Sequence, residues 1–119
     1  MVRAVTEKNQ KKALELYYDL LTLKEPPMRI LFLLAKQFRQ LLLTKKMMIE
    51  EATQNEIAAR LGVPSFVVRN IASCARSYKV DELEKAVEDF VDAEEAVKTG
   101  RLGDVMSVEL LIVKYSSAR

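Results

Sequence analysis

Apolar residues recur at helical spacing along almost the whole chain of 119 residues, and no segment shows the alternation of a strand. The spacing predicts a helix over about 8–23 and a long helix from Pro27 toward Glu51. A helix corner follows over 53–78. Two further helices complete the series toward the C-terminus. We therefore expect an all-α fold, a compact bundle of five to six helices containing a helix-turn-helix-like corner, as a single domain over residues 1–119.

The segment that begins at Pro27 is apolar over most of its circumference in its first half, so we expect it to be the central helix. Its polar interruptions are Gln37, Arg39 and Gln40. A narrow solvated stripe and a set of contacts to a partner explain these three residues equally well.

The corner has the pattern of a helix-turn-helix. Thr53 and Glu56 have the spacing of a capping box, Gly62 supplies the tight turn, and Pro64 can begin the second helix. The inner face of that second helix should hold Val68, Ile71, Ala72 and Ala75. Its outer face should present Arg69, Asn70, Ser73 and Arg76. Arginine and asparagine pair with guanine and adenine edges, so a DNA-reading helix is one interpretation, and a packed corner without DNA contacts is the commoner one.

Two more helices are predicted after the corner. Asp81 and Glu84 form a second capping box, and Gly100 is suited to end that helix in a left-handed conformation. Asp104 is suited to be the N-cap of the last helix. The apolar faces of these two helices comprise Leu83, Ala86, Val87, Phe90, Val97, Val108, Leu111, Ile112 and Tyr115.

Composition excludes several kinds of site. The chain has no histidine and one cysteine, so His-paired nucleophiles, His metal ligation and Cys clusters are excluded. Cys74 is expected to be a buried, inert thiol. The three glycines do not form a phosphate-cradling loop. We therefore predict no catalytic residue, no metal ligand, no cofactor and no small-molecule substrate.

No membrane segment is expected. The longest uncharged apolar run, Ile30 to Ala35, is far shorter than the roughly 20 residues that span a bilayer. The N-terminal residues lack the apolar core of a secretory signal. These features predict a cytoplasmic protein.

Charge is unevenly distributed although the net charge is only +2. Residues 1–52 carry ten Lys or Arg against six Asp or Glu, residues 53–79 carry four against one, and residues 80–119 carry five against ten. A dedicated DNA-binding domain is usually more basic. Solvated helix faces explain most of these charges, and faces of opposite sign also suit a protein that lies between two different neighbours.

Four segments together carry a family resemblance. They are ILFLLAKQFRQLL at 30–42, EIAARLGVPSFVVRNI at 56–71, ELEKAVEDFVDAEEAVKTG at 82–100 and SVELLIVKY at 107–115. In this order and spacing they resemble the C-terminal domain of the delta subunit of bacterial DNA polymerase III, the clamp-loader subunit, over nearly the whole chain. Ser65 departs from the family pattern, in which we expect the proline and the phenylalanine on either side of it to be adjacent.

The resemblance implies an assembly role in DNA replication. In that family this region is the collar domain, a helical bundle that joins related domains of the other clamp-loader subunits, of delta prime and gamma/tau type. The full subunit also has N-terminal ATPase-like domains, which this chain lacks, so we interpret the chain as a domain excised from a longer subunit. Clamp opening is not assigned to it, and DNA contact is expected to be indirect or weak.

The resemblance also suggests where partners bind. Gln37, Phe38 and Arg39 match the QFR triplet of the family, and Lys98 belongs to its KTG motif, which also suits a plain helix C-terminus. Phe66 is predicted to be an exposed anchor on the outer side of the corner. The candidate partner interface is thus Gln37, Phe38, Arg39, Phe66 and Lys98, and the candidate weak DNA contacts are Arg69, Asn70 and Arg76. The function predicted is a noncatalytic assembly domain of a clamp loader, with a helix-turn-helix DNA-binding regulator as the alternative.

Overall fold

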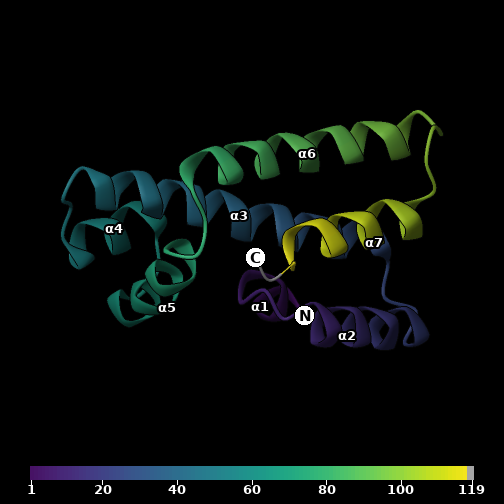
Figure 1. Cartoon of the computed structure of the whole chain (residues 1–119), viewed down its shortest axis with the longest axis horizontal. Helices are drawn as coiled ribbons and strands as arrows, with labels where there is room; N and C mark the ends of the chain where they lie inside the picture. The colour runs from purple at the N-terminus through teal and green to yellow at the C-terminus, as the bar shows by residue number, and fades with distance from the viewer. Residues whose placement is uncertain (118–119) are drawn as a thin grey trace.

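The computed structural model describes residues 1–117, which form seven helices and no strand (Figure 1). The helices are α1 (Val2–Thr6), α2 (Gln10–Thr22), α3 (Pro27–Ile49), α4 (Gln54–Leu61), α5 (Ser65–Ala75), α6 (Val80–Lys98) and α7 (Asp104–Tyr115). The predicted all-α bundle is confirmed, with one helix more than expected.

The additional helix is α1, which the sequence pattern missed. Lys8 was expected within the first long helix, but its backbone has a φ of 59°, and α2 begins only at Gln10. The Asn9 side chain caps α2 by accepting a hydrogen bond from the Lys12 amide at 3.2 Å. A helix of five residues is too short to display an apolar period, and α1 is identified by its packing, since Val5 is buried in the core.

Helix α3 is the central helix, as predicted. It packs against α5, α6 and α7, and Figure 1 shows it and α6 extending along the long axis of the molecule. Its buried side chains are Ile30, Leu31, Leu34, Ala35, Phe38, Leu41 and Thr44. Because these residues lie on one broad side, the opposite side of α3 remains exposed.

Phe38 of α3 is the centre of an aromatic cluster. Its ring centroid lies 5.6 Å from that of Tyr78, 5.3 Å from that of Phe90 and 5.5 Å from that of Tyr115. These separations are typical of favourable tilted and edge-to-face aromatic pairs. The cluster joins α3, α6 and α7 to the turn that follows α5.

The corner formed by α4 and α5 has the predicted local structure. Thr53 Oγ1 accepts from the Glu56 amide at 3.1 Å, and the Glu56 carboxylate accepts from the Thr53 amide at 2.8 Å. The hydrogen bond from the Thr53 backbone amide lowers the pKa of the Glu56 carboxyl group. Gly62 has a φ of 72°, which a side chain disfavours. The corner holds a small apolar cluster of its own against the end of α3, comprising Ile57, Ala58 and Val68 with Met47 and Met48.

Two predicted helix starts are wrong by one or two residues. Helix α6 has Lys79 as its N-cap, and the Lys79 amide donates to the Glu82 carboxylate at 2.9 Å. Asp81 therefore lies within the first turn rather than at the cap. Asp104 is the first residue of α7 and not its N-cap. Gly100 adopts the predicted left-handed conformation, with a φ of 76°.

Over residues 1–117, no helix is long and apolar enough to cross a membrane.

Candidate interaction surface

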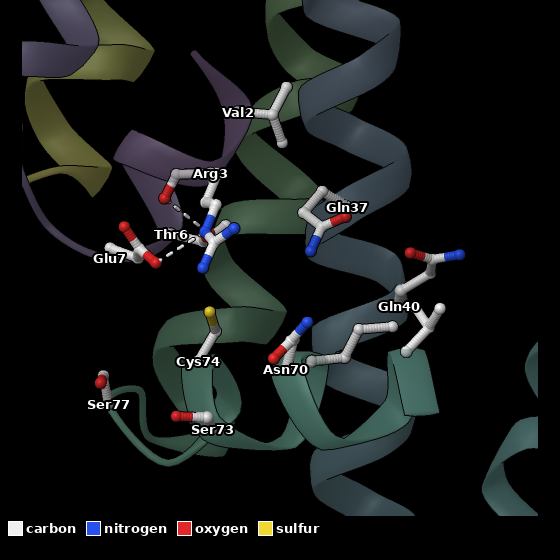
Figure 2. Close-up of a pocket in the computed structure, with 12 residues that line it drawn as sticks. Val2, Arg3, Thr6, Glu7, Gln37, Gln40, Asn70, Ser73, Cys74 and Ser77 are labelled. Atoms are coloured by element: carbon white, nitrogen blue, oxygen red, sulfur yellow. Dashed lines mark hydrogen bonds and ion pairs between the residues drawn. The ribbon is translucent and has the colours of Figure 1, made fainter. Parts of the chain in front are cut away.

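A groove of about 550 Å³ lies between α3 and α5 and is closed on a third side by α1. Gln37 and Gln40 come from α3, while Asn70 and Ser73 come from α5. Figure 2 shows the amide groups of Gln37 and Asn70 directed toward the space between the two helices. A side-chain amide offers both donors and an acceptor, so this groove can bind the polar atoms of another chain.

The floor of the groove adds an apolar component. Val67 and Ile71 of α5 and Val2 of α1 line it between the polar side chains. Small apolar areas beside polar groups are the usual composition of protein contact surfaces. The groove is thus suited to a polypeptide partner that brings both kinds of contact.

The α1 side of the groove carries an ion pair. Arg3 Nε lies 2.9 Å from a Glu7 carboxylate oxygen, and Figure 2 shows both side chains at the edge. The hydrogen bond and the charge of Glu7 raise the pKa of Arg3. Thr6 Oγ1 donates to the Arg3 carbonyl at 3.1 Å, which fixes this hydroxyl within α1. Because the two charges neutralise each other, this edge has no net charge.

Cys74 also lines the groove (Figure 2). Its thiol was expected to be buried, but the residue is only partly buried. The expectation failed because Cys74 lies at the boundary between the inner face of α5, which holds Ala75, and its outer face, which holds Ser73.

The QFR triplet on α3 points in three directions. Gln37 lines the groove, Phe38 is completely buried and Arg39 is exposed. Successive helical residues are about 100° apart around the axis, so three adjacent side chains cannot share one face. Phe38 is therefore a core residue that supports the surface, and its inclusion in the candidate interface is corrected on this ground.

The other candidate partner residues lie far from one another. Phe66, near the start of α5, is 69% exposed, as predicted from its position on the outer side of the corner. Lys98 is the last residue of α6 and forms an ion pair with Glu94 at 2.9 Å. Figure 1 shows that end of α6 at the opposite end of the molecule from α5. The groove thus brings Gln37 close to the outer face of α5 but does not include Lys98.

The candidate DNA contacts lie on the outer face of α5, where the sequence placed them. Arg69, Asn70 and Arg76 are all exposed. Asn70 also lines the groove, so one candidate DNA residue and one candidate partner residue, Gln37, lie on the same groove.

Two structural features were not predicted from the sequence: the α1 edge of the groove and the contacts of Asp89 with α7. The α1 edge was missed because α1 itself was not predicted. Asp89 accepts hydrogen bonds from Lys114 at 2.7 Å and from the Tyr115 hydroxyl. No local signal reveals such a contact, because 25 and 26 residues separate the partners.

The chain is similar to known proteins in both sequence and structure. The family model for the C-terminal domain of the DNA polymerase III delta subunit matches residues 1–115. The chain is 28% identical over 114 residues to DNA polymerase III subunit delta of Bacillus subtilis (strain 168), a match that covers 96% of this chain and 33% of that protein. Its structure is similar to the Bacillus subtilis DNA clamp loader delta protein, with a TM-score of 0.86, 28% identity, and coverage of 97% of this chain and 34% of the other.

The chain thus spans about a third of the length of the relatives that it matches. The agreement in sequence extends over the helices that build the core, the corner and the groove. The family resemblance seen in the four sequence segments is confirmed, and this chain belongs to the family formed by the C-terminal domains of DNA polymerase III delta subunits.

Proposed function

We propose that this domain is the noncatalytic collar domain of a clamp-loader delta subunit, and that it binds the corresponding domains of delta prime and gamma/tau-type subunits in the cytoplasm. The observation that carries this function is the family match over residues 1–115. In this proposal residues 1–119 form one oligomerisation domain of a longer subunit, and the clamp-opening elements belong to the rest of that subunit.

The groove between α3 and α5 is the proposed contact surface. Its amide, hydroxyl and apolar groups match the mixed composition of contacts between proteins. Phe66 extends this surface along α5 with an exposed ring, and a large aromatic side chain is a frequent anchor at protein interfaces. Gln37, Asn70 and Phe66 are therefore the residues that we assign to the contact.

A protein partner suits this surface better than DNA does. The Arg3 and Glu7 charges at the groove edge neutralise each other, whereas DNA binding needs an excess of cations. The family assignment also favours the clamp-loader function over a helix-turn-helix regulator. We propose that any DNA contact through Arg69, Asn70 and Arg76 is weak.

Sedimentation velocity with separately purified collar domains tests this function. The domain alone should sediment as a monomer or a weakly associated species, and its mass should increase when a partner collar is added. Asn70→Ala should weaken that association by roughly fivefold or more, because the amide lies in the contact. Asn55→Ala is the matched control, since Asn55 is exposed on α4 and does not line the groove.

The possible outcomes test the assembly role and the groove contact separately. No increase in mass with any partner collar, at concentrations in the tens of micromolar, would contradict the assembly role. A complex that forms but responds equally to Asn70→Ala and Asn55→Ala would keep the assembly role and remove the groove from the contact.

A further inference from the structure

A second pocket, of about 460 Å³, lies at the start of α6 and shares no lining residue with the groove. Four lysines line it, and they come from different parts of the chain: the turn between α1 and α2, the α6 N-cap, the body of α6 and the end of α7. These residues are Lys8, Lys79, Lys85 and Lys114. Chain segments that are distant in sequence thus place four ammonium groups around one cavity.

Two of these ammonium groups are positioned by aromatic rings. Lys8 Nζ lies 4.4 Å from the ring centroid of Tyr78, and Lys114 Nζ lies 5.5 Å from the ring centroid of Tyr115. A cation within about 6 Å of a ring centroid is attracted by the ring electrons. Both rings also line the pocket, so they hold cations at its wall.

The carboxylates near the pocket do not neutralise it. Asp89 contacts both Lys114, at 2.7 Å, and Lys85, at 3.4 Å. Glu82 lines the pocket, and its carboxylate accepts a hydrogen bond from the Lys79 backbone amide. Four ammonium groups line the pocket or its edge against these two carboxylates, and Glu88 adds one further negative charge near Tyr115, so the positive groups remain in excess.

The start of α6 adds to this positive potential. Lys79 is the N-cap residue, and a lysine side chain has no acceptor with which to cap the first-turn amides. The amino end of a helix carries a partial positive charge, and α6 has 19 residues. The helix end and the lysines therefore act on the same cavity, as in many anion sites.

We propose that this lysine pocket binds a phosphate group, either a free inorganic phosphate or the phosphodiester backbone of a nucleic acid. The contact would be indifferent to base sequence, because the pocket offers no face on which a base can stack. The Tyr78 and Tyr115 side chains are only 3% and 7% exposed, and stacking requires an accessible ring. This site is independent of the assembly role.

Two-dimensional ¹H–¹⁵N NMR tests the site with inorganic phosphate and, separately, a short single-stranded oligonucleotide. We expect saturable shifts of the Lys8 amide and of the first-turn amides of α6, and these shifts should diminish as salt is added. The double variant Lys8→Gln/Lys79→Gln should bind at least roughly tenfold more weakly, because it removes two of the four ammonium groups.

The control is Lys11→Gln/Lys24→Gln, which loses the same total charge outside the pocket. Lys24 has a φ of 64°, close to the 59° of Lys8, so this substitution also matches the backbone conformation of Lys8. Binding of inorganic phosphate alone would identify free phosphate as the ligand, and binding of the oligonucleotide would identify the phosphodiester backbone. Absence of saturable shifts with both probes, or equal weakening in the two double variants, would overturn the proposal.

Discussion

The hydroxyl group of Tyr78 lies 2.9 Å from the backbone carbonyl oxygen of Tyr115, across 37 residues of sequence. The same hydroxyl is 3.2 Å from the carbonyl oxygen of Val5. One buried side chain after α5 therefore connects the last turn of α7 to α1. Burial raises the pKa of Tyr78, because the charged phenolate is disfavoured there.

Replacing this hydroxyl should destabilise the domain. We expect Tyr78→Phe to lower the free energy of unfolding by about 1–3 kcal/mol, because two buried carbonyl groups lose their shared donor. Urea denaturation measures the change. Tyr18→Phe is the control, since Tyr18 is exposed and its hydroxyl donates to the Glu109 carboxylate at 2.7 Å. A loss in Tyr78→Phe no larger than that in Tyr18→Phe would contradict the prediction.

Asp89 should contribute to the acid sensitivity of the fold. Burial by itself raises the pKa of Asp89, but hydrogen bonds from Lys114 and Tyr115 outweigh burial, and the pKa is lowered below its ordinary value of 3.8. A carboxylate with a lowered pKa in the folded state stabilises that state above its ordinary pKa. That contribution is lost as pH falls through the folded-state pKa.

We therefore expect Asp89→Asn to lower the free energy of unfolding by about 1–3 kcal/mol at neutral pH. Below about pH 4 the difference from the parent protein should shrink, because the parent carboxylate becomes protonated. Urea denaturation at a series of pH values measures both effects. Asp92→Asn is the control, since Asp92 lies on the exposed side of the same helix. A pH-independent difference would show that Asp89 acts through packing alone.

Phe66 should matter for association and not for stability. Because its side chain is 69% exposed, Phe66→Ala is expected to change the free energy of unfolding by less than about 0.5 kcal/mol. Association with a partner collar should weaken by roughly fivefold or more. Leu23→Ala is the control, with a side chain that is 75% exposed away from the groove. Unchanged association in Phe66→Ala would exclude this ring as an anchor.

The outer face of α5 should not read a DNA sequence. Selection from random duplexes at near-physiological salt should recover no consensus site, because few cations are available there to neutralise phosphates. Any weak duplex binding by the Arg69→Ala and Asn70→Ala variants should then be independent of DNA sequence, as in the parent protein. Recovery of one consensus that Arg69→Ala abolishes, at a cost of roughly 1–3 kcal/mol, would instead establish a regulator.

ATP should not bind at micromolar affinity. The sequence has no phosphate-cradling glycine loop with a lysine placed in it, and the lysine pocket offers no accessible ring for the adenine base. Isothermal titration calorimetry with ATP measures this directly. Saturable binding of ATP at micromolar affinity would contradict this prediction.

Local patterns predicted most of the helices but only part of the surface. The capping box at Thr53, the left-handed Gly62 and the inner face of α5 depend on residues a few positions apart, so their spacing is legible in the sequence. The exposure of Phe66 followed from the same helical period. The first residue of α6 was predicted wrongly. Glu82 lies three residues after Lys79 and Glu84 lies three residues after Asp81, so both glutamates have the spacing of a capping box, but only Glu82 accepts a hydrogen bond from the N-cap amide.

The all-α fold, the corner and the family can be predicted from the amino-acid sequence, because helical periods, caps and family segments are properties of neighbouring residues. Tertiary packing places Gln37 at a groove and buries Phe38, since both lie on one helix and differ in what packs against them. Tertiary packing also places Lys8 and Lys114 at the wall of one pocket. Such contacts depend on long-range packing around α3. A local sequence pattern does not specify which distant side chains this packing brings together.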